Sequence, residues 1–236
     1  MKKVQALLLS CALLAPAGAV LAQGVVLPQP QNVLQLQASG TVEVQQDLLT
    51  INLTTTREGS DATQVQTQLK AALEAALAEA RRTAQPGLLD VRTGNFALYP
   101  RHNRDGKLTG WSGTAELVLE GRDFPRITQA AGRIQTLTMG GVGFGLSREA
   151  RAKVEAEAQT LAIERFKAKA TALAQGFGFS GYTLREVAVN ADDQGFSPRP
   201  RMVAMEAKGM AADAAVPVEA GKTSVVVTVS GSVQLR

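Results

Sequence analysis

Three methionines stand close together late in the chain, in a stretch with no helical or strand periodicity. Met202, Met205 and Met210 carry thioether sulfurs, which bind soft ions such as copper(I) and are readily oxidised to sulfoxides. Methionine is also a flexible apolar residue that suits an irregular or partner-docking loop. We favour the second interpretation and keep these residues as candidates for a soft-metal or oxidation site.

The other residue types give little material for catalysis. His102 is the only histidine and lies in a polar turn, so the chain cannot assemble a histidine-based metal cluster or a Ser-His-Asp triad. Glu116 and Glu120 stand four residues apart on the polar face of an expected strand and are the weakest candidate, a carboxylate pair for hydrolysis. That arrangement is ordinary for solvent-facing residues. We therefore expect a protein that is not an enzyme, without catalytic residues or a cofactor.

Alternating glycines between Gly140 and Gly145 suggest a phosphate-binding loop. The spacing does not match a dinucleotide fingerprint, however, and no Gly-Lys-Ser/Thr follows for a nucleoside triphosphate. A simpler interpretation is a strand with one glycine face, which allows a helix or another backbone to approach closely.

The N-terminus has the three parts of a signal peptide in order. Lys2 and Lys3 are followed by an apolar run from Val4 to Val20 and by Val20-Leu21-Ala22, which predicts cleavage after Ala22. The run is interrupted by Pro16 and Gly18 and falls short of the about 20 apolar residues of a membrane span. We expect a periplasmic or secreted protein with no transmembrane span in the mature chain.

Cys11 is the only cysteine and lies inside this apolar run. Its surroundings loosely resemble a lipoprotein cleavage box, but apolar residues continue beyond it, so we interpret it as an ordinary small apolar residue. Cleavage would then leave a mature chain without cysteine, and it would also remove two of the lysines behind the net charge of +4. The small remaining excess does not indicate a nucleic-acid partner.

Periodicity predicts the order of the elements. Residues 23–35, with Pro28 and Pro30, have the composition of an extended leader before a domain over residues 36–236. Helices are expected after the capping residues Asp61, Asp123 and Ser147, and the third is expected to run to about Gln175.

Strand-type alternation fills most of the remainder, in the order ββαββαβαβ. An irregular, methionine-bearing insertion over 191–215 precedes a long last strand that carries Val225, Val227 and Val229. Strands in pairs, punctuated by three helices, predict the α+β class with a mainly antiparallel sheet.

Several of these segments, in this order, resemble the SIMPL-domain family, whose bacterial members are described as periplasmic oxidative-stress defence or periplasmic immunogenic proteins. The matching segments are Ala38-Ser39-Gly40-Thr41-Val42-Glu43-Val44 with Asp47, Thr93-Gly94-Asn95-Phe96-Ala97-Leu98-Tyr99-Pro100, Asp105-Gly106, Thr109-Gly110-Trp111, the strand leading to Ser147, Ala168-Lys169-Ala170 with Leu173-Ala174, and Val216-Pro217-Val218-Glu219-Ala220-Gly221. The chain departs from the family pattern at Gln46 and Ala220, where proline is common.

The resemblance implies an α+β fold and ring- or channel-like homo-oligomers, and it supplies no established catalytic residues. It suggests an exported, non-enzymatic, oligomeric protein linked to envelope or oxidative stress tolerance, in which we expect the long helix and the last strand to make the assembly contacts. The alternative is a periplasmic binding module for a small ligand, a soft metal or an envelope polymer, the last of these a possible partner.

Overall fold

The computed structural model describes residues 31–191 and 218–236, and the chain from Asn32 to Arg236 forms one compact unit. The expected signal peptide, Cys11 and the three methionines lie outside the described residues. Within the described part, no helix combines the length and apolar character needed to cross a membrane.

The elements follow the predicted order, and the α+β class is confirmed. They are β1 (Val33–Gln45), β2 (Leu48–Gly59), α1 (Ala62–Arg81), β3 (Asp90–His102), β4 (Leu108–Gly121), α2 (Phe124–Arg133), β5 (Thr138–Gly145), α3 (Arg148–Gly176), β6 (Tyr182–Ala191) and β7 (Lys222–Leu235). β1 begins three residues before the boundary expected between the leader and the domain.

The helices begin where the sequence places their caps. The side chains of Asp61, Asp123 and Ser147 each accept a hydrogen bond from a backbone N–H of the first turn, which satisfies a donor that has no partner inside the helix.

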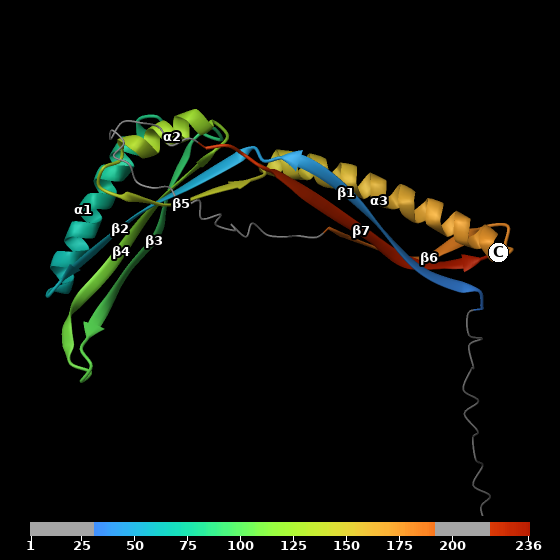
Figure 1. The fold of residues 1–236 in the computed structure, drawn as a ribbon, viewed down its shortest axis with the longest axis horizontal. Helices are drawn as coiled ribbons and strands as arrows, with labels where there is room; N and C mark the ends of the chain where they lie inside the picture. Colours follow the sequence, from blue (N-terminus) through green and yellow to red (C-terminus); the bar gives the residue numbers. More distant parts are fainter. Residues whose placement is uncertain (1–30, 192–217) are drawn as a thin grey trace, which may run out of the picture. The chain divides into compact units, whose positions relative to one another are not determined.

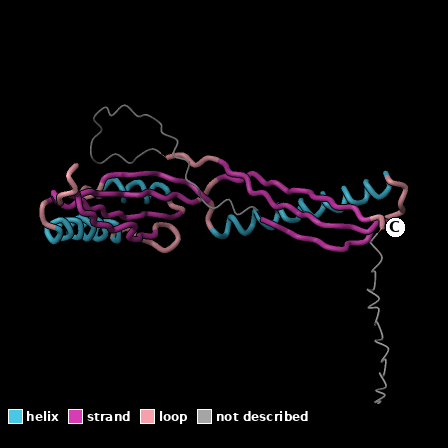
Figure 2. Tube along the Cα trace, turned by 90° about the horizontal axis from the view of Figure 1, so that it is seen from below, coloured by secondary structure: helices cyan, strands magenta, loops and turns pink. Residues whose placement is uncertain are grey.

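The first and last strands of the described chain pair with each other in a three-stranded antiparallel sheet, sheet A. Its order is β1-β7-β6, so the C-terminal strand is the central one. α3 packs along one face of this sheet, mainly over β1 and β7, and Figures 1 and 2 show the helix running beside the strands. Their shared core contains Phe166, Val227, Val229 and Val233.

α3 approaches β1 closely because its buried stripe consists largely of alanines. The buried residues recur every four positions and are Val154, Ala158, Ala162, Phe166, Ala170 and Ala174. A Cβ built on Gly40 would clash with the Ala158 carbonyl oxygen and lie 2.7 Å from the Ala162 backbone nitrogen. The absence of a side chain at Gly40 therefore allows the backbones of β1 and α3 to lie this close together.

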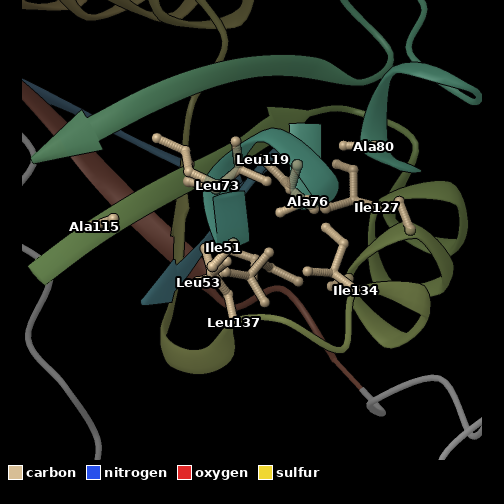
Figure 3. Packing of buried hydrophobic residues seen from close by; sticks show 14 of the residues in the cluster. Ile51, Leu53, Leu73, Ala76, Ala80, Ala115, Leu119, Ile127, Ile134 and Leu137 are labelled. Atoms are coloured by element: carbon tan, nitrogen blue, oxygen red, sulfur yellow. The ribbon is translucent and has the colours of Figure 1, made fainter. Parts of the chain in front are cut away.

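The second sheet, sheet B, has the order β3-β4-β2-β5 and is also antiparallel. α1 and α2 cover one of its faces (Figure 1). Figure 3 shows the packing between sheet and helices, where Ile51 and Leu119 from the strands meet Leu73 and Ile127 from the helices. The opposite face carries the polar residues of the alternation.

The glycines of β5 were expected to allow close approach of a helix or another backbone, and Gly141 does not have this role. Gly141 pairs with Asn52, whose chain neighbours Ile51 and Leu53 are buried, so it belongs to the polar face. A Cβ on Gly141 would meet nothing within 4 Å. No helix or backbone approaches sheet B at that position, and the expectation was wrong there.

Candidate functional site

The polar face of sheet A contains an open hollow of about 580 Å³. Six of its lining residues form two rows across the sheet, because the strand register places them opposite one another. The first row is Gln35, Ser232 and Glu186, and the second is Gln37, Ser230 and Ala188.

This hollow offers neutral amide and hydroxyl groups together with one carboxylate, Glu186, and one ammonium group, Lys169. Such groups form hydrogen bonds to polar molecules. The next row continues the pattern, with Ser39 and Thr228 hydroxyls 3.0 Å apart. Among the described residues that line the hollow, none pairs a nucleophile with a base.

The free edge of β1 is covered by basic side chains from α3. Lys169 Nζ donates to the Gln37 carbonyl oxygen at 3.1 Å, and Arg165 Nη1 donates to the Ser39 carbonyl oxygen at 2.7 Å. Arg165 and Lys169 are about one helical turn apart on α3, and the carbonyls of Ser39 and Gln37 are two residues apart on the same side of β1. The spacing along the helix therefore matches the spacing along the strand. Charged groups on an edge oppose pairing with another strand.

The other edge of sheet A lacks this cover. Among the strands of residues 31–191 and 218–236, β6 pairs with β7 on one side only, and three of its large apolar residues are exposed: Leu184 at 55%, Val187 at 43% and Val189 at 45%. The strands therefore leave one edge that is apolar and accessible, which we call the β6 edge (residues 182–189). β7 and α3 were expected to make assembly contacts; β7 is paired on both sides and so has no free edge in sheet A, and their part in assembly stays a prediction.

On the polar face of sheet B, the two glutamates considered for hydrolysis have separate partners. Glu116 Oε2 accepts from the Asn95 backbone N–H at 3.0 Å. Glu120 Oε2 accepts from the Thr50 hydroxyl at 3.2 Å and lies 3.9 Å from an Arg92 guanidinium nitrogen. At about 3.3 Å of rise per residue, four residues of strand hold these carboxylates roughly 13 Å apart. They form no acid–base pair.

A hydrogen-bonded junction connects the start of α3 with the turn between β1 and β2. The Asp47 carboxylate accepts from the Ser147 backbone N–H at 2.7 Å and from the Ser147 hydroxyl at 2.6 Å. Ser147 Oγ in turn accepts from the Ala150 N–H at 3.2 Å. The helix cap is therefore itself oriented by a carboxylate at the positive end of the helix dipole.

Gln46, where the family commonly has proline, contributes to the same junction. Its backbone N–H donates to the Gly221 carbonyl oxygen at 3.0 Å, and its side-chain amide donates to the Phe144 carbonyl oxygen, also at 3.0 Å. Proline has no N–H and no amide, so this position makes contacts here that the family's usual residue cannot make.

The remaining sequence candidates are not brought together. His102 is exposed at the end of β3, and Arg101 beside it pairs with Glu58. The methionine candidates Met202, Met205 and Met210 lie outside the described residues and stay a prediction. Within residues 31–191 and 218–236, no group of three or more His, Cys, Asp or Glu side chains could hold a metal ion.

Sequence reasoning missed the β6 edge and the hollow. The signal for β6 was present in its run of apolar residues, but strand alternation predicts which residues share a face and not which strand occupies a sheet edge.

A comparison with protein-family models decides the family. The model described as "SIMPL: Protein of unknown function (DUF541)" matches residues 34–233. The chain belongs to the SIMPL family. Its SIMPL domain thus begins inside β1 and ends inside β7, and it includes both sheets.

Other comparisons add little to this assignment. Among curated proteins, no match to this SIMPL protein was found. One solved structure, described as "The crystal structure of AtUAH in complex with glyoxylate", is 13% identical, with 55% of this chain and 34% of that chain covered and a TM-score of 0.25. At that TM-score the similarity carries no argument about fold or function.

Proposed function

We propose that this SIMPL protein is an exported, non-enzymatic protein that assembles into homo-oligomers in the cell envelope and contributes to envelope or oxidative stress tolerance. The observation that carries the assembly part is the β6 edge, a strand with an unpaired side and exposed Leu184, Val187 and Val189. Exposed apolar strand edges pair with other chains unless they are covered.

Export is supported by the order of charges and apolar residues over 1–22, which fits a cleavable signal peptide. The non-enzymatic part rests on residue types: a single histidine in a polar turn, and glutamates on sheet B with individual structural partners. The hollow on sheet A favours recognition of a polar molecule as an additional property of the same assembly.

Native mass spectrometry of the protein, produced with its own leader and collected from the envelope fraction, tests this proposal. We expect a subunit that begins at Gln23 and has 214 residues, present as an oligomer. A strict monomer at micromolar concentration would contradict the assembly part, and an intact leader in the cytoplasmic fraction would contradict the export part.

Stress tolerance is tested separately by comparing survival in peroxide of cells with and without the gene. Restoration by the full chain, but not by a chain that lacks residues 1–22, is the expected result. Equal survival of both cell types would remove this part of the proposal and leave the oligomer intact.

A further inference from the structure

The residues of the β6 edge form a sequence that is complementary to itself when read in the opposite direction. Its eight residues are Tyr182, Thr183, Leu184, Arg185, Glu186, Val187, Ala188 and Val189. We propose that two copies of this chain pair antiparallel through their β6 strands about a two-fold axis between Arg185 and Glu186. The proposal rests on the proposed oligomeric function and names the surface and partner that begin the assembly.

The first argument is the distribution of side chains over the two faces of sheet A. Leu184 pairs with Val233 and Val187 with Gly231, which belong to the face of β7 that packs on α3, and the register shifts between Leu184 and Glu186. This β-bulge adds Arg185 to the strand. As a result Leu184 and Val187 share one face although three positions separate them.

The bulge makes a symmetric pairing possible. Residues directly opposite each other in an antiparallel pair must have side chains on the same face. With the axis between Arg185 and Glu186, Leu184 stands opposite Val187 of the second copy, and Tyr182 stands opposite Val189. Both pairs lie on the α3 face, so all four apolar residues meet apolar partners.

Charge complementarity is the second argument. In the same register Arg185 of one copy stands opposite Glu186 of the other, and the axis creates this pair twice. Among residues 31–191 and 218–236, the Glu186 carboxylate has no ion-pair partner. Within the same described residues, the Arg185 side chain donates a hydrogen bond to a neutral oxygen, from Nη1 to Gln234 Oε1 at 3.5 Å. Charges that would repel an unrelated strand attract a second copy.

The geometry of the sheet supports the bulge as a built feature. A Cβ on Gly231 of β7 would clash with the Glu186 carbonyl oxygen, so glycine opposite the bulge lets the β6 backbone lean toward β7. This close approach lies directly beside the register shift between Leu184 and Glu186.

The third argument is closure. Pairing through β6 produces a six-stranded sheet in the order β1-β7-β6-β6-β7-β1, with a β1 strand at each end. Arg165 and Lys169 cover the carbonyls of that end strand. A two-fold contact of this kind is closed, because the charged side chains at both outer edges of the sheet oppose pairing with a further strand.

Sedimentation equilibrium of the mature chain with charge-swap variants tests the proposal. Arg185→Glu places Glu opposite Glu, and Glu186→Arg places Arg opposite Arg, so each single variant should weaken dimerisation by about tenfold, since two pairs per dimer change from attraction to repulsion. The double variant restores opposite charges and should return to within a few-fold of the wild-type constant.

The matched control exchanges a pair within one chain. Lys222 Nζ lies 3.4 Å from a Glu43 carboxylate oxygen on neighbouring strands of the same sheet. Glu43→Lys combined with Lys222→Glu should leave dimerisation unchanged. Thermal unfolding of all variants shows whether any single variant has lost its fold.

Cysteine cross-linking in a Cys11→Ser background gives a second test of the register. Leu184→Cys and Val187→Cys chains, when mixed and oxidised, should form the mixed disulfide, because opposite residues stand about 5 Å apart. Each variant alone should form far less, because three residues of offset separate identical positions by roughly 10 Å.

The outcomes separate this inference from the proposed function. If the wild type assembles and the single charge variants assemble equally well, the β6 contact is overturned while the oligomer stands. If another segment or protein covers the β6 edge instead, the double variant will not regain association and no mixed disulfide will form. A monomeric wild type overturns both.

Discussion

At the scale of single residues, the folded structure lowers the pKa of one carboxylate, Asp123. Asp123 caps α2, and its Oδ2 accepts from Arg126 Nε at 2.9 Å while its Oδ1 accepts from the Arg126 backbone N–H at 3.1 Å. The side-chain hydrogen bond from Arg126, followed by the backbone hydrogen bond, lowers the pKa of Asp123 below its ordinary value of 3.8.

This lowered pKa predicts a pH-dependent contribution to stability. Because the folded-state pKa lies below the unfolded value, the stabilisation is present above pH 3.8 and is lost as the pH falls through the folded-state pKa. Asp123→Asn keeps a capping oxygen but has no charge. We therefore expect its melting temperature to be below that of the wild type near neutral pH, and the difference to shrink in acid.

The control for this prediction is the same substitution in an Arg126→Met background, where the difference should depend less on pH. Melting curves measured by circular dichroism across the acidic range are sufficient. A difference between wild type and Asp123→Asn that stays constant with pH would contradict the assignment.

At the scale of elements, the contact between α3 and β1 depends on the absence of a side chain at Gly40. Alanine at this position would press its methyl group against backbone atoms of Ala158 and Ala162, which cannot rotate away. Overpacking of this kind costs about 1–3 kcal/mol, and rigid backbone neighbours place Gly40→Ala at or above the upper end.

Gly141→Ala is the matched control, because a Cβ there has no neighbour within 4 Å. Its free energy of unfolding should be unchanged or slightly higher, since alanine restricts the unfolded chain. Urea denaturation of both variants measures the difference. Equal stability of the two would mean that α3 can move away from β1 at little cost.

These elements also show how far the sequence could be interpreted alone. The alternation Val225, Val227, Val229 and the cap at Ser147 predicted a strand and a helix correctly, because both signals are local. The order of the strands in a sheet depends on contacts between distant parts of the chain. Ser39 and Thr228, for example, are 189 residues apart. No local pattern contains that information.

The same limit explains the errors about glycine and the candidate site. Glycines on β5 and Gly40 on β1 are equivalent as sequence signals, and only packing distinguishes the one beneath a helix. Likewise the polar residues of the hollow come from β1, β6 and β7, with Lys169 from α3, so their proximity follows from strand order and from the packing of the helix. On α3, Leu161 and Leu173 are only half-buried, because the buried stripe of this helix recurs every four residues.

At the scale of the whole molecule, the described chain has two hydrophobic clusters that share no residue. One lies between sheet B and helices α1 and α2, and the other lies between sheet A and α3. Their connection includes the Asp47–Ser147 junction and the Arg122–Glu149 ion pair. Hydrophobic clusters that share no residue can open as separate cooperative units.

Two large-to-small substitutions test this separation. Phe166→Ala creates a cavity in the sheet A cluster and Ile127→Ala creates one in the sheet B cluster, each costing about 2–5 kcal/mol. Native-state hydrogen exchange should show that Phe166→Ala lowers protection in α3, β1 and β7, while α1 and β4 stay protected. Ile127→Ala should produce the reverse pattern, and equal loss everywhere would indicate a single cooperative unit.

The central position of β7 also fixes the order in which the chain becomes able to fold. Every strand of sheet B is complete once Gly145 has been made, whereas β1 pairs with Lys222–Leu235, which are made much later. Sheet A therefore cannot form until β7 has been made. β1 and β6 stay unpaired until Lys222–Leu235 have been made, and an unpaired, extended chain is the state in which a protein can be threaded through a membrane channel.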